Sequence, residues 1–322
     1  MTGERELLQR LIEGPVSGDA LARDAGLTRA AVWKRIEALR EGGLRIDAQA
    51  GRGYALADSI ELLDAERIRA VLQAATTAAL SSLEVAWSLD STNSELLRRQ
   101  APERGTDVLL AEQQTGGRGR RGRQWASPIA SNLYLSLSRQ FSGGLARLGG
   151  LSLVVGVAVA EALRRAGYEA VGVKWPNDLL AHGHKLGGIL VEGGGEHGGP
   201  VRAVIGIGLN VRMPSPVAAT IDQAWTDLGA LAGNAPSRNL LASQVLDALL
   251  PALEDFDRDG LSVFLARYAA LDVLAGRVVT VHGPQGDEHG IADGIGADGA
   301  LRVKVGQAMR HVHAGEVSVR TT

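Results

Sequence analysis

Residues 116–125 read GGRGRRGRQW, and this alternation of glycine with arginine is the sharpest local feature of the chain. Glycine lets the backbone approach a ligand closely, and arginine supplies planar donor groups that match phosphate and carboxylate. The run lies between two predicted strands, 107–111 and 132–137. Such a loop suits phosphate or an acyl-phosphate anhydride, although a solvated or RNA-binding arginine–glycine loop has a similar composition. Its place between strands favours a loop of a compact domain.

Outward from this loop, strand-like and helix-like runs alternate between about residues 82 and 271. Further strands are predicted at 83–89, 170–173, 189–192 and 201–207, and helices at 151–166 and 239–271. The strands are spaced too irregularly for simple βαβ repeats, which favours an α+β fold with a mixed central layer. We expect this central domain to span residues 61–272, with an amphipathic connecting helix at 61–72.

Two motifs place a lysine beside a turn or beside glycines. KWPND, residues 174–178, follows a predicted strand; its proline ends the strand and its Asn-Asp pair can reverse the chain, as in an ordinary turn. KLGGILVE, residues 185–192, sets Lys185 before two glycines at the start of an apolar strand. A cation there can stabilise charge on a carboxylate that attacks a phosphate. The alternative is a solvent-facing lysine, but only four of the 34 basic residues are lysines.

Two further motifs suggest a pocket for a flat, polar-edged molecule. Gly206 and Gly208 lie two residues apart in a predicted strand, so both leave the same face bare for a ring system. A bulge or close sheet packing would also explain them. Ser91, Thr92 and Asn93 follow a strand and cap the next helix, where hydroxyls can bind a carbonyl oxygen. Capping alone would fully explain that motif.

The first 60 residues carry the pattern of a helix-turn-helix domain with a wing. Helices are predicted from residues 7, 18 and 29, and residues 44–56 predict two short strands around a glycine–arginine tip. Between residues 28 and 40, four basic residues face one acid, which suits a helix in a DNA major groove. The alternative is a helical packing module with solvated arginines. The candidate DNA contacts are Thr28, Arg29, Trp33, Lys34, Arg35 and Arg52.

Residues 273–322 predict a small β-barrel. The β-rich runs are 278–282, 289–292, 301–305, 309–313 and 317–320, separated by glycine-rich turns. No cysteine is present, which excludes disulfides, thiolate nucleophiles and cysteine-based metal sites. The 322 residues carry a net charge of −2, so a nucleic-acid site must be a local patch. A secretory signal is absent and the most apolar stretch, 148–160, is too short to span a bilayer, so we expect a cytoplasmic protein.

Taken in order, these segments resemble the biotin protein ligases, specifically the bifunctional bacterial type that also represses the biotin operon. The resemblance is carried by STN from residue 91, GRGRRGR from 117, KWPND from 174, KLGGILVE from 185 and GIGLN from 206. It extends to the helix TRAAVWKRIEALR, the wing GRGY and the closing GEVSVR. It implies a winged helix-turn-helix domain, a catalytic domain similar to class II aminoacyl-tRNA synthetases, and an SH3-like C-terminal barrel.

The resemblance also implies a reaction in two steps. Biotin and Mg-ATP give biotinyl-5′-adenylate and pyrophosphate, and the adenylate then acylates one lysine of the biotin carboxyl carrier protein of acetyl-CoA carboxylase. Operator DNA and a ligand-promoted homodimer are the other implied partners. Neither a redox cofactor nor a structural metal is expected. Mg²⁺ would arrive largely with the nucleotide, and Asp178 is the one protein ligand that we can suggest.

Site residues carried over from the family fall into three groups. The biotin group is Ser91, Thr92, Asn93, Gln114, Arg118, Gly119, Arg120, Lys185, Gly206 and Gly208. The nucleotide group is Arg118, Arg120, Arg121, Lys174, Asn177, Asn210 and Trp225, the last ending a loop from about Val211. Lys185, Arg118 and Arg120 are the implied catalytic residues. One departure is the additional glycine at Gly116, which is expected to loosen the arginine loop.

Two other functions remain open at this point. A lipoate or octanoyl ligase has a related catalytic fold, but is not expected to combine this arginine–glycine set with a winged helix. A ligand-sensing repressor without transferase activity needs neither Lys185 nor the arginine loop.

Overall fold

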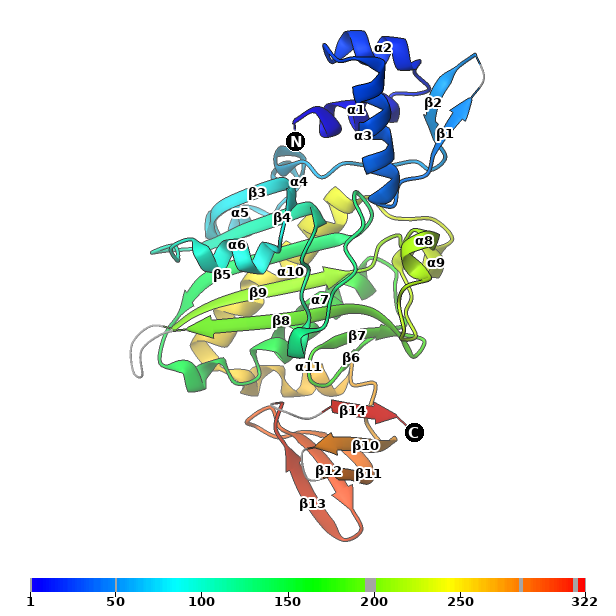
Figure 1. The fold of residues 1–322 in the computed structure, drawn as a ribbon. Coiled ribbons are helices and arrows are strands. Elements are labelled where there is room, and N and C mark those ends of the chain that lie inside the picture. Colours follow the sequence, from blue (N-terminus) through cyan, green and yellow to red (C-terminus); the bar gives the residue numbers. More distant parts are fainter. Residues whose placement is uncertain (1, 50, 195–200, 284–285, 315–317, 322) are drawn as a thin grey trace.

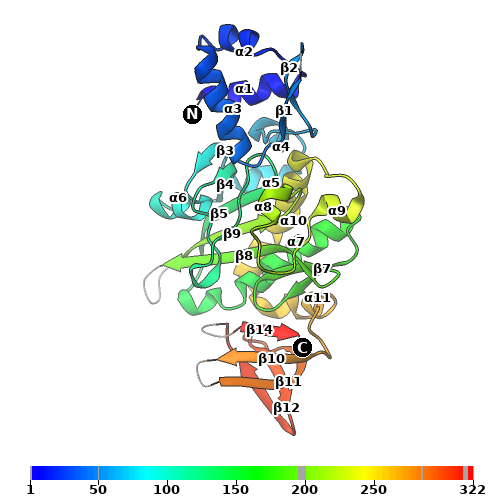
Figure 2. The same cartoon turned by 45° about the vertical axis from the view of Figure 1, so that its right-hand side comes forward.

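Three units follow one another along the long axis of the molecule in the computed structural model (Figure 1). The structure describes residues 2–49, 51–194, 201–283, 286–314 and 318–321. A helical unit with a two-stranded sheet lies at the N-terminal end, a seven-stranded sheet with helices in the middle, and a five-stranded sheet at the C-terminal end. Figure 2 shows the same order from a second direction. No helix in the described part of the chain is both long enough and apolar enough to cross a membrane.

The N-terminal unit follows the predicted pattern closely. Its elements are α1 (Thr2–Ile12), α2 (Gly18–Asp24), α3 (Arg29–Glu41), β1 (Ile46–Gln49) and β2 (Gly53–Leu56). Ser17 and Thr28 cap α2 and α3, accepting hydrogen bonds from the backbone N–H groups of Ala20 and Ala31 at 3.1 and 3.2 Å. β1 and β2 pair as an antiparallel hairpin in the position predicted for the wing. Local sequence signals are therefore sufficient to predict the helices and strands of this unit.

The central sheet has the strand order β3-β4-β5-β9-β8-β7-β6. Its strands are β3 (Leu80–Leu89), β4 (Thr106–Gln114), β5 (Leu133–Phe141), β6 (Val171–Lys174), β7 (Asp178–Ala181), β8 (His184–Gly194) and β9 (Val201–Leu209). Only β3 and β4 pair in parallel, in agreement with the predicted absence of βαβ repeats. The sequence analysis missed β7, since four residues between two turns are too few to show a period.

Helices cover the two faces of this sheet unequally. The long helices α7 (Leu151–Arg165) and α10 (Arg238–Asp259) lie on one face, and the short helix α6 (Thr92–Arg98) lies on the other (Figure 1). The run 239–271 is helical as predicted but is interrupted, because Gly260, at a φ of +74°, ends α10. A 3₁₀ turn (Leu261–Phe264) and α11 (Leu265–Ala269) follow. The connecting segment forms α4 (Ala65–Ala70) and an unpredicted α5 (Ala74–Ala79).

A buried ion pair joins the connecting segment to the central sheet. Arg238 donates to the Glu112 carboxylate at 2.8 Å, and the side chains of both residues are less than 5% exposed. Glu112 also accepts a hydrogen bond from the backbone N–H of Leu63 at 2.5 Å, and Arg238 donates to the carbonyl of Asn132. Because every partner is satisfied, removing one member would cost about 3–5 kcal/mol of stability.

The N-terminal unit rests on the two loops that follow β4 and β9. Ile129 and Ala130 pack into its core, and the Ile129 N–H donates to the carbonyl of Gly42 at 2.9 Å. Asp58 accepts from Arg45 at 2.9 Å and lies 3.4 Å from a guanidinium nitrogen of Arg212. These two cations hold the pKa of the Asp58 carboxyl below its ordinary value, with the Arg45 hydrogen bond as the main cause.

The C-terminal unit is a five-stranded antiparallel sheet. Its strands are β10 (Val278–Gly283), β11 (Gly286–Ile295), β12 (Leu301–Val305), β13 (Ala308–Val312) and β14 (Ser318–Thr321), in the order β13-β12-β11-β10-β14. The predicted strand 317–320 begins at a residue outside the described ones. Within the described residues β13 and β14 do not pair, so this sheet is open where the barrel prediction expects closure. Trp175 attaches it to the central sheet through a 3.0 Å hydrogen bond from its indole N–H to the carbonyl of Gly299.

Candidate functional site

A cavity of about 1200 Å³ opens on the face of the central sheet that α7 and α10 leave free. Its walls come from the start of α6, the arginine loop, the turn between β6 and β7, the first residues of β8, the glycines of β9 and residues 213–225. All fifteen small-molecule residues predicted from the sequence line it: Ser91, Thr92, Asn93, Gln114, Arg118, Gly119, Arg120, Arg121, Lys174, Asn177, Lys185, Gly206, Gly208, Asn210 and Trp225. Segments far apart in the chain thus meet at one place.

One wall of the cavity is a row of polar side chains that begins at the cap of α6. Ser91 accepts a cap hydrogen bond from the N–H of Ser94 at 3.4 Å. The side-chain oxygen of Gln114 accepts from the N–H of Thr92 at 2.8 Å, and its nitrogen donates to Ser127 at 3.2 Å. Gln114 therefore ties the start of α6 to the segment after the arginine loop. Capping alone does not account for these contacts.

The glycine strip of β9 is covered by side chains of this chain. A Cβ atom added at Gly206 would stand 2.3 Å from the Asn93 side-chain oxygen, and one at Gly208 would stand 2.4 Å from the indole of Trp125. Gly188 of β8 lies under the same indole. The flat ring that lies on the strip in this structure belongs to Trp125. Both glycines must therefore lack side chains for the wall to pack.

The sequence analysis missed Trp125 and Gly188 as lining residues. Trp125 is the last residue of the quoted arginine run, and its position beside that run was the available signal. Its indole nitrogen is buried and has no hydrogen-bond partner among the described residues. The nitrogen lies over Gly208, and an unpaired buried donor is costly.

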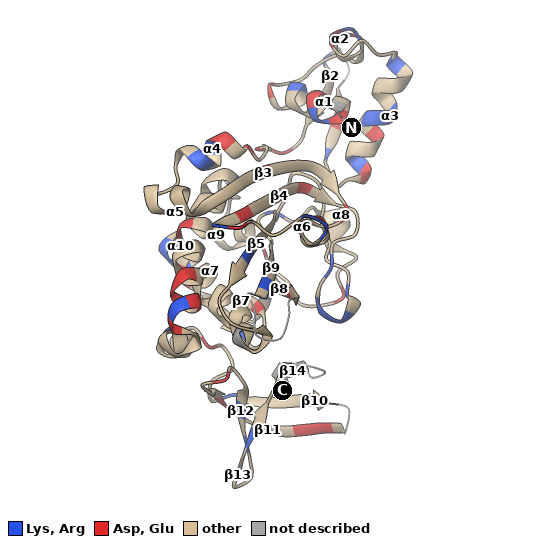
Figure 3. Cartoon of the chain, turned by 90° about the vertical axis from the view of Figure 1, so that its left-hand side faces the viewer, with Lys and Arg blue, Asp and Glu red and all other residues tan. Residues whose placement is uncertain are grey.

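The arginine loop is an ordered hairpin that projects from the sheet, coloured largely blue on the right of Figure 3. The N–H of Gly119 donates to the carbonyl of Arg123 at 2.7 Å, and Trp125 pairs back to Gly117 at 2.9 Å. Gly116 does not loosen the loop as expected, because its N–H donates to the carbonyl of Asp90 at 2.8 Å. Gly117 is packed so closely that an added Cβ would stand 2.7 Å from its neighbours.

The two implied catalytic arginines contact different walls. A guanidinium nitrogen of Arg118 lies 3.1 and 3.2 Å from the two carboxylate oxygens of Glu192. Arg120 donates to the side-chain oxygen of Asn177 at 3.2 Å and to the carbonyl of Ala314 in the C-terminal unit. Burial lowers the pKa of Arg120, and the neighbouring charge of Arg121 lowers it further. Arg120 thus joins the loop to two other segments.

Lys185 points into the cavity beside an acidic partner. Its ammonium nitrogen lies 2.9 Å from a carboxylate oxygen of Asp178 and 5.6 Å from the centre of the Trp125 ring. Its backbone exchanges hydrogen bonds with Ala224 and Thr226, so Trp225 is held alongside. Asn210 donates to the carbonyl of Thr226 at 3.0 Å. Residues 224–226 are therefore fixed against the start of β8.

The candidate Mg²⁺ ligand Asp178 is already occupied by Lys185. No group of three or more His, Asp or Glu side chains in the described part of the chain is arranged to hold a metal ion. A single carboxylate suits Mg²⁺ that brings most of its ligands as phosphate oxygens and water.

Five of the six candidate DNA contacts face solvent at α2–α3 and the wing. Thr28 and Lys34 are exposed, as is Arg52 at the wing tip. Arg29 forms an exposed ion pair with Asp19 at 3.2 Å, and the side chain of Trp33 is 54% exposed. Arg35 is the exception. Its guanidinium lies against Gly3 of α1, within 2.7 Å of where a Cβ would stand, so it packs inside the N-terminal unit.

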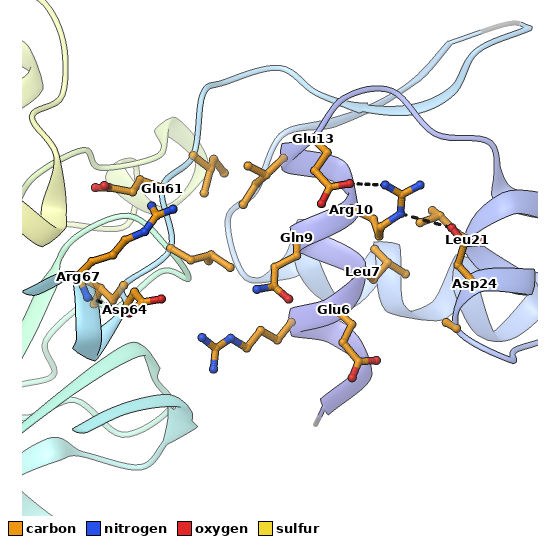
Figure 4. Close-up of a pocket in the computed structure, with 16 residues that line it drawn as sticks. Glu6, Leu7, Gln9, Arg10, Glu13, Leu21, Asp24, Glu61, Asp64 and Arg67 are labelled. Atoms are coloured by element: carbon orange, nitrogen blue, oxygen red, sulfur yellow. Dashed lines mark hydrogen bonds and ion pairs between the residues drawn. The ribbon is translucent and has the colours of Figure 1, made fainter. Parts of the chain in front are cut away.

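A second cavity, of about 630 Å³, lies between α1, α2 and residues 60–67 (Figure 4). None of the predicted site residues lines it. Its central cation, Arg10, is held by Glu13 and, at 3.3 Å, by Asp24. The larger cavity is therefore the candidate functional site.

Comparison with known proteins agrees with this arrangement. Residues 85–210 match the model of the biotin/lipoate A/B protein ligase family, residues 4–55 an HTH domain and residues 275–320 a biotin protein ligase C-terminal domain. The bifunctional ligase/repressor BirA of Salmonella typhimurium is 40% identical over 98% of this chain and 97% of its own length. The Escherichia coli protein of that name is 39% identical, over 95% and 93%.

A solved structure agrees as well. The biotin protein ligase from Aquifex aeolicus in complex with biotin and ATP superposes with a TM-score of 0.62 and 25% identity, covering 75% of this chain and all of that one. The chain therefore belongs to the biotin protein ligase family, among the members that carry an N-terminal helix-turn-helix domain.

Proposed function

We propose that the large cavity of this biotin ligase binds biotin and ATP side by side and joins them as biotinyl-5′-adenylate, with release of pyrophosphate. The observation that carries the proposal is the convergence of Lys185, Arg118 and Arg120 with a polar row and the glycines of β9 in one cavity. A carboxylate and a triphosphate repel one another, so several cations are needed to bring them into contact.

Each wall then has its own part in the first step. Thr92, Asn93 and Gln114 bind the ureido edge of biotin, whose rings lie beside Gly206 and Gly208 with Trp125 as a neighbouring wall. Lys185 stabilises negative charge as the biotin carboxylate attacks the α-phosphate and pyrophosphate leaves. Arg121, Lys174, Asn177, Asn210 and Trp225 hold the nucleotide. Mg²⁺ arrives with the triphosphate, and Asp178 is the protein carboxylate nearest to Lys185.

In the second step the carrier protein supplies the nucleophile. The amine of one lysine on the biotin carboxyl carrier protein attacks the acyl carbon of the adenylate, and AMP leaves. The mixed anhydride would hydrolyse in open solvent, so the arginine loop and residues 211–225 must exclude water. No enzyme nucleophile is needed, which is consistent with a chain that has no cysteine.

The N-terminal unit makes the protein a repressor as well as a ligase. Both BirA relatives are named ligase/repressors, and α3 and the wing expose the residues expected to contact operator DNA. The protein acts in the cytoplasm as a ligand-promoted homodimer on two half-sites. In this proposal residues 1–60 bind DNA, residues 61–272 form the catalytic domain and residues 273–322 form the small C-terminal domain.

Pyrophosphate exchange into ATP tests the enzymatic half. Purified protein is given biotin or lipoate in parallel, and we expect exchange with biotin alone. Exchange with lipoate alone would move the activity to a lipoate ligase, and exchange with neither would favour a sensor without ligase chemistry.

Operator binding tests the repressor half. Affinity for DNA carrying the chain's own biotin-operon promoter is measured with and without biotin plus ATP, and we expect tighter binding with both ligands. Equal affinity in the two conditions would show that DNA binding does not depend on biotin and ATP.

A further inference from the structure

We propose that Glu192 is a positioning residue of the ligase site, which holds Arg118 and sets the orientation of the polar row that binds biotin. This inference rests on the proposed function. Glu192 belongs to β8 and is not among the residues that line the cavity. It therefore acts from behind the wall, through two residues that do line it.

Glu192 contacts two segments of the site, the arginine loop and the start of α6. Its carboxylate oxygens lie 3.1 and 3.2 Å from a guanidinium nitrogen of Arg118 in the arginine loop. One of them also accepts from the side-chain amide of Asn93, at the start of α6, at 2.8 Å. The Asn93 residue is only 2% exposed, and the Glu192 side chain is 26% exposed. The contact to Asn93 is therefore the sheltered one.

The carboxylate helps to determine which way the amide of Asn93 points. An ionised carboxylate only accepts hydrogen bonds, so the amide nitrogen of Asn93 must face Glu192 and the carbonyl of Leu190. The amide oxygen then faces Ser136, whose hydroxyl lies 2.6 Å away and must donate to it. Glu192, through the shorter of the two contacts, and the carbonyl of Leu190 therefore hold this amide in one orientation together.

The same argument continues along the row to Thr92. The Ser136 hydroxyl also lies 2.6 Å from the Thr92 hydroxyl, and the Thr92 hydroxyl donates to the side-chain oxygen of Gln114 at 3.1 Å. Gln114 accepts the backbone N–H of Thr92 at 2.8 Å. Gln114, Thr92, Ser136 and Asn93 therefore form one connected row of hydrogen bonds that ends at Glu192.

The negative charge of Glu192 does not itself favour the binding of biotin or ATP. Both substrates are anions, and a carboxylate near the arginine loop repels them. Its value must then come from the placement of Arg118 and Asn93. Hydrogen bonds that involve a charged group contribute about 1.5–3 kcal/mol, so loss of this placement is worth roughly a tenfold or greater change in biotin affinity.

The test is Glu192→Gln in the full-length protein, measured by pyrophosphate exchange with biotin and ATP varied separately. We expect the KM for biotin to rise about tenfold or more, and by a larger factor than the KM for ATP. Glu192→Asp keeps the charge but cannot reach both partners, so we expect a KM for biotin between those of the wild type and Glu192→Gln. This second variant also serves if the first does not fold.

Glu161→Gln is the matched control. Glu161 lies on α7 behind the sheet, pairs with Arg267 at 2.9 and 2.7 Å, and has the same 26% side-chain exposure as Glu192. Wild-type kinetic parameters in Glu161→Gln would show that losing an ion pair of similar exposure does not by itself raise the KM for biotin. If Glu192→Gln also kept the wild-type KM for biotin, the inference would be overturned. A wild-type protein that shows no exchange with biotin would instead overturn the proposed function.

A double variant identifies the route through Arg118. If Glu192 acts partly by holding that guanidinium, the effects of Arg118→Ala and Glu192→Gln on the KM for biotin are less than additive. Full additivity would remove Arg118 from the proposal.

Discussion

Helix α3 and the arginine loop are both rich in basic residues, yet their side chains are held in opposite ways. In α3 the capping residue and the buried apolar residues hold the helix in place. Arg29 forms an exposed ion pair with Asp19 of the preceding helix. In the loop the partners are remote. Arg118 pairs with Glu192, 74 residues away, and Arg120 contacts Asn177 and Ala314, 57 and 194 residues away.

The basic residues of the two regions therefore contribute different things: those of α3 provide exposed positive charge, and those of the loop are held in fixed positions. Exposed arginines offer a DNA backbone a field that is insensitive to small displacements, because phosphate contacts position a protein without reading sequence. The loop must set guanidinium groups around a reaction, where a displacement of about 1 Å is costly. Substitutions in α3 should therefore change DNA binding alone, and substitutions around the loop should change ligand retention and catalysis.

The largest effect is expected for the cation that faces the loop from β8. Lys185→Ala should slow pyrophosphate exchange by about 10² or more, since charge develops where its ammonium stands. Lys304→Ala, on an exposed position of β12, is the control and should exchange at the wild-type rate. Exchange within a few-fold of wild type in Lys185→Ala would take Lys185 out of its catalytic role.

The next effect probes the loop itself. Arg120→Gly removes two contacts that tie the loop to other segments, so we expect about tenfold faster dissociation of labelled adenylate in a chase experiment. Arg123→Gly, at an exposed position of the same loop, controls for the added backbone freedom. Equal dissociation rates in the two variants would show that the contacts of Arg120 do not retain the ligand.

A smaller effect is expected at Asp58, which joins the N-terminal unit to the loop after β9. Asp58→Asn should lower the stability of the N-terminal unit by about 1 kcal/mol at pH 7. The folded pKa of Asp58 lies below its unfolded value, so its contribution is present above the unfolded pKa and is lost as pH falls through the folded pKa. Wild type and variant should therefore converge in thermal melts at acid pH. A gap that persisted there would contradict the ionic origin.

Lys34→Ala tests how the positive charge of α3 contributes to DNA binding. We expect operator binding to weaken by a similar factor on all sequences, and the slope of log affinity against log salt to fall by about 1. Pyrophosphate exchange should be unchanged. A change of sequence preference would mean that Lys34 reads bases.

The smallest effect is expected for the exposed pair of α3. Arg29→Ala should change the free energy of unfolding by no more than about 0.5 kcal/mol, since both side chains are more than 70% exposed. Thermal melts of Arg29→Ala and Asp19→Ala would test this. A loss above about 1 kcal/mol would show that local charge does hold α3.

The structure also shows where sequence patterns stop predicting. β7 was missed because it is a four-residue strand between turns, and the interruption of the helical run 239–271 was missed because it depends on one glycine at positive φ, Gly260. Both features span too few residues to show a periodic signal. The fifteen site residues came from motifs of the family, and their assembly in one cavity is a property of the fold.

The sequence alone determined the capped helices, the wing, most strands and the motifs that mark the ligase family, because these depend on neighbours a few residues apart. Only the tertiary structure decided that Trp125 lies on the glycine strip, that Arg35 packs onto Gly3 and that Glu192 joins Arg118 to Asn93. Such contacts depend on which strands become neighbours and which face each residue takes, and that information is spread over the whole chain.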